Sequence, residues 1–275
     1  MRTVAFEKYE GLGNDFVVVD LPKSALSIPE VIAICDRHRG VGADGVLFVG
    51  EPEPAMRVVN ADGSTAEMCG NGLRCVAFHF ARRGAGHEPL QIATDAGAHR
   101  AHVVSSQGAS AIVSVSMRAA SLVLDEIPVR ADGPMIDAPM RALDRMVHVT
   151  AVSMGNPHAV LFDDVGEARL ALGPAIQDDP RFPKKANVGF ARMREGARSA
   201  MTLHVYERGA GWTEACGTGA CAAAVAAVET GRARRGEPID VHLPGGVLEI
   251  VVGAREERIQ MTGPARHVFS GSIAI

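Results

Sequence analysis

The sequence predicts an α/β protein built from two tandem halves that share one topology. The first observation is a motif of the form E-x-C-G-x-G that occurs twice, around Cys69 and Cys216, which lie 147 residues apart. The second is that the residues flanking the two copies also match. The third is that short runs of Val, Ile and Leu are broken by Gly, Pro and Asp, as in many short strands around a few helices. A single repeat of this length indicates a duplication rather than a solenoid.

Within each half, a strand is expected before the motif and a helix after it. Residues 201–205 alternate apolar and polar side chains, as a half-buried strand does, and the shorter run 56–60 occupies the equivalent place. After the first motif, apolar residues recur at helical spacing; after the second, residues are small and apolar nearly all round, which predicts a helix buried on every side. Gly84 and Gly231, each 15 residues after its Cys, are expected to end these helices.

The seam between the halves is expected in the loop-like region 117–128. The stretch "SSQGAS" at 105–110 is better explained as a hairpin turn between two strands. The final segment, "MTGPARHVFSGSI", is a candidate for crossing back to the first half.

Composition favours an ordinary globular protein. The net charge is −4, with 47% hydrophobic and 22% charged residues, so no nucleic-acid or anionic-membrane partner is expected. No apolar run is long enough to span a bilayer, and the N-terminal residues lack the apolar stretch of a signal peptide. Five cysteines without such a signal indicate reduced thiols and a cytoplasmic location. No second C-x-x-C or H-x-x-x-H pair completes a zinc site, so no metal is expected.

Each motif Cys is expected at the head of a helix, where unpaired N–H groups and the helix dipole favour negative charge and lower a thiol pKa. Related halves usually face each other across a cleft, where one thiolate can remove a proton from carbon while the opposite thiol delivers one, inverting a stereocentre without a cofactor. Taken singly, a Cys is more often a small buried hydrophobe and G-x-G is a weak signal. The repetition in register favours catalysis for Cys69 and Cys216, whereas Cys35, Cys75 and Cys221 are assigned to packing.

Blocks along the whole chain carry a family resemblance: "GLGNDFVVVD", "VNADGSTAEMCGNGLRC", "SMGNPHAV", "NVGF", "ERGAGWTEACGTGACA" and "GPARHVF". With these blocks in this order, the chain resembles the diaminopimelate epimerases of lysine and cell-wall precursor synthesis. The resemblance implies two pseudo-symmetric lobes, each a mixed β-sheet or barrel wrapped around a central helix. The expected lobes are 1–117 with 264–275, carrying Cys69, and 118–263, carrying Cys216. It also implies a cofactor-independent conversion of LL-diaminopimelate to meso-diaminopimelate, and commonly a homodimer.

The same resemblance implies a role for each matching residue. Cys69 and Cys216 are the acid–base pair, and His158 and Glu207 tune the two thiols. The substrate-binding residues are Asn14, Asn60, Gly70, Asn71, Asn156, Asn187, Glu207, Arg208, Gly217 and Thr218. Gly70-Asn71 and Gly217-Thr218 supply backbone donors to the reacting carboxylate, and Arg208 binds the distal one, for which a guanidinium is well suited.

Other interpretations remain open at this point. Taken alone, Asn14 and Asn156 also fit turns, His158 fits a packed histidine, and Glu207-Arg208 fits an exposed ion pair. Proline or hydroxyproline racemases share the paired cysteines, and some related proteins act on other amino acids such as histidine. From another class, a thiol redox or binding protein is the alternative, although no C-x-x-C is present.

Overall fold

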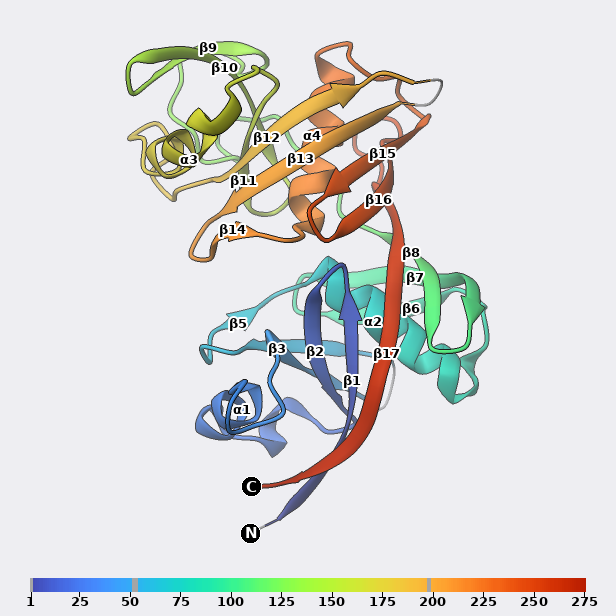
Figure 1. The fold of residues 1–275 in the computed structure, drawn as a ribbon. Coiled ribbons are helices and arrows are strands. Elements are labelled where there is room, and N and C mark those ends of the chain that lie inside the picture. The colour runs from blue at the N-terminus through green and yellow to red at the C-terminus, as the bar shows by residue number, and fades with distance from the viewer. Residues whose placement is uncertain (1, 51–53, 197–198) are drawn as a thin grey trace. The chain divides into compact units, whose positions relative to one another are not determined.

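The computed structural model describes residues 2–50, 54–196 and 199–275. The chain divides into two compact units, Met1–Ser116 with Thr262–Ile275 and Met117–Met261, coloured in Figure 1 from blue to red along the sequence. The expected lobe boundaries were 117/118 and 263/264. Within the described residues, no helix combines the length and the apolar character needed to cross a membrane.

The first unit is a mixed sheet around one helix. Its strand pairing runs β17–β1–β2 antiparallel, β2–β3 parallel and β3–β4–β5 antiparallel, while β6, β7 and β8 form antiparallel hairpins and β8 also pairs with β17. Helix α2 contacts β1, β2, β3, β6, β7 and β8, so strands surround it (Figure 1). The elements are β1 (Thr3–Gly11), β2 (Asn14–Val19), α1 (Ile28–Cys35), β3 (Gly45–Val49), β4 (Met56–Asn60), β5 (Thr65–Ala66), α2 (Gly70–Phe80), β6 (Leu90–Thr94), β7 (Gly97–Gln107), β8 (Ser110–Ser116) and β17 (Gln260–Ala274).

The second unit repeats this plan around helix α4. Strands β9, β10 and β11 are antiparallel, β11 and β12 are parallel, β12, β13 and β14 are antiparallel, and β13 pairs in parallel with β15 of the β15–β16 hairpin. The elements are β9 (Ala138–Ala142), β10 (Arg145–Ser153), β11 (Pro157–Leu161), α3 (Arg169–Gln177), β12 (Asn187–Arg194), β13 (Ala200–Glu207), β14 (Gly211–Thr213), α4 (Gly217–Glu229), β15 (Pro238–Leu243) and β16 (Gly246–Val251).

The predicted duplication is confirmed element by element. The order β1-β2-α1-β3-β4-β5-α2-β6-β7 corresponds to β10-β11-α3-β12-β13-β14-α4-β15-β16. The strand pairings match in direction, and the counterpart of the parallel β13–β15 ladder in the first unit is the single parallel bridge Ala55↔Ala93. Both segments expected as strands before the motifs form strands, β4 and β13. Each expected helix follows its motif directly.

The helix ends and the tail also agree with prediction. Residues 220–227 of α4 are all buried, because Ala side chains let strands approach from every side. Gly231 adopts φ +71° two residues after α4, whereas α2 continues into a π-helical turn, Ala81–Ala85, within which Gly84 leaves helical geometry at φ +106°. The stretch 105–110 contains the β7–β8 hairpin turn. Strand β17 returns to the first unit and pairs with β1 from Thr3↔Ala274 onward.

Candidate active site

The two motif cysteines occupy equivalent positions in the two units. Cys69 is the N-cap of α2 (φ −135°, ψ 117°) and Cys216 is the N-cap of α4 (φ −123°, ψ 105°). Each sulfur accepts a hydrogen bond from the backbone N–H three residues later, from Gly72 at 3.4 Å and from Gly219 at 3.3 Å. The side chain of an N-cap residue ordinarily accepts such a bond through oxygen. The predicted placement of both thiols at helix heads is therefore confirmed.

The last glycine of each C-G-x-G lies in a closely packed place. A Cβ on Gly219 would lie 3.1 Å from the Cys216 sulfur and 3.1 Å from a methyl of Val205. A Cβ on Gly72 would lie 3.2 Å from both δ-methyl groups of Leu47. The glycines thus let the first helical turn close against the sulfur that their N–H groups contact.

In the first unit, a chain of side-chain hydrogen bonds leads to Cys69. The Cys69 thiol donates to Oδ1 of Asn14 over 3.9 Å, and Nδ2 of Asn71 donates to the same oxygen at 3.2 Å. Nδ2 of Asn14 donates to the carboxylate of Asp44 at 2.6 Å, and the guanidinium of Arg74 donates to Oδ1 of Asn71 at 3.0 Å. The structure thereby brings together three predicted site residues, Cys69, Asn14 and Asn71.

In the second unit, a different chain leads to Cys216. Nε2 of His158 bonds to Oδ1 of Asn156 at 3.0 Å, and Nδ2 of Asn156 donates to the hydroxyl of Thr218 at 3.5 Å. That hydroxyl lies 3.6 Å from the Cys216 sulfur. Because an amide oxygen only accepts, Nε2 of His158 carries a proton. His158 reaches the thiol through two other predicted site residues rather than by direct contact.

The prediction that a helix head lowers the pKa of the thiol is wrong for Cys216. Burial raises the pKa of this thiol well above its ordinary value, and the nearby Glu207 carboxylate raises it further. The Thr218 hydroxyl and the Gly219 N–H lower the pKa, but by less. Cys216 is only 4% exposed, and removing water from a charged sulfur outweighs the contribution of the helix terminus. Glu207 is itself held by the hydroxyl of Thr213, which donates at 2.5 Å.

Burial also decides the charge of His158. It lowers the pKa of the imidazole to about 3, and the positive charge of Arg208 acts in the same direction. His158 is therefore neutral at physiological pH.

Three predicted residues stand apart from these two chains. Asn187 is buried opposite His158 in the β11–β12 register; it donates to the carbonyl of Pro157 and accepts the backbone N–H of Arg208 at 2.8 Å. The exposed Arg208 side chain donates to the carbonyl of Lys184. Asn60, at the end of β4, donates to the hydroxyl of Ser64 at 2.9 Å. Gly70 and Gly217 are the first residues of α2 and α4.

Sequence reasoning missed Arg74, Asp44 and Thr213. Arg74 is fully buried although it looks like a solvent-facing charge on a helix. Its place three residues after Asn71, on the same helix face, is the only sequence signal that links it to the site. Asp44 contacts Asn14 and Asp15 only in the folded chain, and Thr213 likewise contacts Glu207. No spacing in the sequence predicts these contacts.

The remaining cysteines are buried, as their assignment to packing requires. Cys35, Cys75 and Cys221 are at most 4% exposed, and burial raises the pKa of Cys35 to about 11. Among residues 2–50, 54–196 and 199–275, no group of three His, Cys, Asp or Glu side chains is arranged to hold a metal ion.

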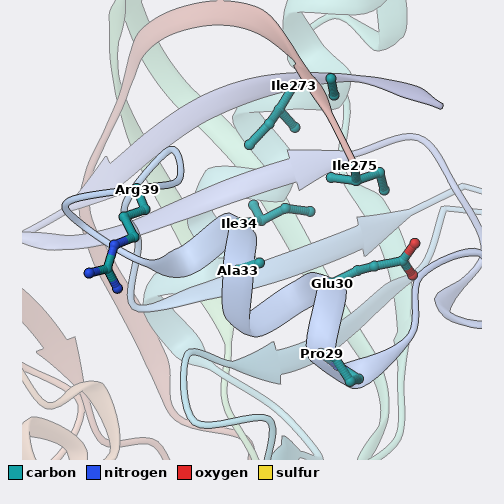
Figure 2. A pocket seen from close by; sticks show the side chains of 8 residues that line it. Pro29, Glu30, Ala33, Ile34, Arg39, Ile273 and Ile275 are labelled. Atoms are coloured by element: carbon teal, nitrogen blue, oxygen red, sulfur yellow. The ribbon is translucent and has the colours of Figure 1, made fainter. Parts of the chain in front are cut away.

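A cavity of about 320 Å³ lies elsewhere in the first unit, between α1 and the end of β17 (Figure 2). Its wall is mainly aliphatic, with Ile34 and Ile275 facing it and Glu30 and Arg39 at its edges. None of the predicted site residues lines this cavity. It is therefore separate from the thiol-bearing helix heads.

Comparison with known proteins agrees with the motif blocks. The family model described as "Diaminopimelate epimerase" matches residues 6–123 and 150–268. The chain belongs to the diaminopimelate epimerase family. A diaminopimelate epimerase of Thermosynechococcus vestitus is 44% identical, with 98% of this chain and 99% of the relative covered. One of Synechocystis is 42% identical, with 99% of each covered.

Solved structures share the fold of this diaminopimelate epimerase family member at low sequence identity. A hydroxyproline epimerase from Agrobacterium vitis has a TM-score of 0.66 at 15% identity, covering 99% of this chain and 91% of that one. A phenazine biosynthesis protein of the PhzF family from Bacillus anthracis has a TM-score of 0.67 at 15% identity, with both chains fully covered. Together with the internal duplication, these likenesses confirm the predicted fold class of two related α/β lobes.

Proposed function

We propose that this protein converts LL-2,6-diaminopimelate to meso-diaminopimelate without a cofactor, a step in the synthesis of lysine and peptidoglycan precursors. The observation that carries the proposal is the pair of equivalent thiols. Each unit supplies one cysteine as the N-cap of its central helix, with a backbone N–H on the sulfur. Membership of the diaminopimelate epimerase family supports the choice of substrate.

The proposed reaction is a proton exchange at one α-carbon. One sulfur, as thiolate, takes the α-proton, and the electron pair of the C–H bond passes into the adjacent carboxylate. The other sulfur, as thiol, then gives its proton to the opposite face of the carbon, so the stereocentre is inverted and the two sulfurs exchange protonation states. Backbone N–H groups of the first helical turns, at Gly70-Asn71 and Gly217-Thr218, are proposed to stabilise the charge that develops on the carboxylate.

The raised pKa of Cys216 suits this thiol to the role of proton donor. Burial and the Glu207 carboxylate favour its protonated form at neutral pH. It therefore acts as the proton donor in the direction in which Cys69 acts as the base. The hydroxyl of Thr218 lies 3.6 Å from the sulfur and steadies the thiolate once the proton has left.

The rest of the substrate is assigned to the predicted asparagines and the arginine. Asn14 and Asn156 offer amide groups beside the thiols, and such groups suit an ammonium as well as a carboxylate. Asn60, Asn187 and Arg208 are proposed to bind the distal amino-acid end, where the guanidinium makes a bidentate contact to the second carboxylate. Asn187 supports this role by accepting the backbone N–H of Arg208.

Single replacements of the thiols test the proposal. Cys69→Ser and Cys216→Ser should each lower kcat for LL-diaminopimelate by at least about 100-fold, because a hydroxyl is a far weaker acid and base than a thiol at neutral pH. Each variant should still eliminate hydrogen halide from a 3-halogenated diaminopimelate, since that reaction needs only one base. Near-normal epimerisation by either variant would refute the two-thiol mechanism. Replacing Cys75 by Ser serves as a control for the loss of a buried sulfur.

The assembly and location are also proposed. A homodimer is supported by exposed apolar side chains on neighbouring strands β7, β8 and β17: Val104, Ile112, Val268 and Phe269. Light scattering should give about twice the chain mass of 28.9 kDa, and a single-chain mass at micromolar concentration would contradict the dimer. A cytoplasmic location follows from the need for reduced thiols and is checked by cell fractionation.

A further inference from the structure

Arg74 is the largest fully buried side chain of the protein's described residues, and it lies in the second turn of α2. Its guanidinium donates from Nε to the carbonyl of Pro264 on β17 at 3.1 Å and from Nη2 to Oδ1 of Asn71 at 3.0 Å. Gly11, at the end of β1, packs over it so closely that a Cβ there would lie 3.2 Å from Nη2. Arg74 therefore joins the helix head to two strands of the first unit.

The hydrogen bonds of Arg74 determine how the neighbouring amides point. A guanidinium only donates, so the side chain of Asn71 must turn its oxygen toward Arg74 and its NH₂ group toward Asn14. At the other end, the carboxylate of Asp44 only accepts, so Asn14 must turn its NH₂ group toward Asp44. Both ends thus require the same orientation of Asn14, with Oδ1 facing Asn71 and the thiol of Cys69.

Asp44 is itself firmly held. One carboxylate oxygen accepts both the amide of Asn14 and the backbone N–H of Asp15, and the other accepts from Arg37 at 2.7 Å. This end of the chain of hydrogen bonds is fixed by three independent donors. The Arg74 end is fixed by burial and by β17.

The duplication provides an internal comparison. The position in α4 equivalent to Arg74, 147 residues later, is Cys221, which is buried. There Asn156 turns its NH₂ group toward Thr218 on the helix head and its oxygen toward His158. Asn14 does the reverse, because it turns its oxygen toward Asn71 on the helix head. The two units therefore share a backbone plan but orient the asparagine differently.

We propose that Arg74 and Asp44 are positioning residues for the first thiol: together they hold Asn71 and Asn14 in one orientation, so that the Asn14 carbonyl faces Cys69. This inference rests on the proposed function and deepens it. Its consequence is selective, because the reaction of Cys69 depends on these residues and the reaction of Cys216 does not.

The test uses one-base elimination, which separates the two thiols. The full-length chain carries either Cys216→Ser, leaving Cys69 as the base, or Cys69→Ser, leaving Cys216, and Arg74→Met is added to each. With a 3-halogenated diaminopimelate, Arg74→Met should lower kcat by about 10-fold or more in the Cys69-only protein, since small misplacement of a reacting group is costly. In the Cys216-only protein the change should stay within about twofold, and Arg74→Lys, which keeps a donor, should restore part of the rate.

The control is Cys221→Ala, the equivalent position of α4, which should change neither elimination rate by much. If Arg74→Met does not fold, as judged by circular dichroism, Asn71→Asp replaces it. This variant still accepts from Arg74 but cannot donate to Asn14, and it should show the same selectivity for Cys69.

The outcomes separate the two proposals. Equal losses in both single-thiol proteins, or no loss in the Cys69-only protein, would overturn the positioning role. If neither single-thiol protein eliminates halide before Arg74 is changed, the proposed function itself fails.

Discussion

At the scale of single residues, the closest packing lies where the sulfurs of Cys69 and Cys216 contact the N–H groups of Gly72 and Gly219. Gly219 has the Cys216 sulfur and Val205 within 3.1 Å of where a Cβ would be, whereas Gly72 faces the ends of a flexible leucine. The Cys216 sulfur is the proposed reacting atom, whereas the Leu47 side chain can rotate away. Two chemically identical glycines should therefore respond differently to the same change.

Gly219→Ala is expected to lower kcat by about 10-fold or more, because the new methyl group displaces the Cys216 sulfur. Gly72→Ala is its matched control and should lower kcat by less than about threefold, because Leu47 can move. Alanine is the better helix former, so neither variant should lose much thermal stability. Steady-state kinetics and a melting curve check both statements, and equal kinetic effects in the two variants would contradict this account of the first helical turn.

The residues also show which features a sequence can predict. The positions of Cys69 and Cys216 at helix heads follow from local pattern, because strand, cap and helix are all encoded within about twenty residues. The pKa of Cys216 does not follow, because it depends on burial and on Glu207, which reaches the sulfur only through the fold. Arg74 was missed for the same reason: an arginine on a helix is ordinarily exposed, and here it contacts β1 and the returning strand β17 only in the folded chain.

At the scale of elements, the duplication strengthens the prediction of strands and helices, because each segment can be compared with its equivalent in the other half. The β4 run alone is a weak strand signal, but its equivalence with β13 strengthens the prediction, and both are strands. The all-apolar helix α4 is predicted as buried, and it is. By contrast, α2 is equally buried, although its Arg74 and His79 are polar. Local hydrophobicity cannot reveal that these two side chains find partners inside the unit.

The periodicity of apolar residues does not predict which distant strands pair with each other. Strand β17 is separated from β1 by more than 240 residues of chain, yet it pairs with nearly the whole of β1, from Thr3↔Ala274 to Glu10↔Arg266. The residues of β17 do not indicate which strand lies beside it. The resemblance to a family, rather than the physical pattern, supplied the expectation that this segment returns to the first unit. Its return matters for the site, since β17 supplies the carbonyl that Arg74 contacts.

At the scale of the whole molecule, each of the two units carries one of the two equivalent cysteines. Their common plan explains why the sequence carries the same motif twice. Their differences, Arg74 and Asp44 in one unit and Glu207 and His158 in the other, make the two thiols chemically unequal. An exchange of protons between unequal partners can run in both directions while each direction begins from a different sulfur.

The central claim is that one sulfur takes the α-proton and a different sulfur returns one. Conversion of LL-diaminopimelate in D₂O without added cofactor tests it most directly, by mass spectrometry and NMR of substrate and product at early times. We predict that the first meso product carries one deuterium at the inverted carbon, while the remaining LL substrate keeps its hydrogen. Product that retains the original α-hydrogen, or LL substrate that gains deuterium as fast as product forms, would contradict the two-sulfur mechanism.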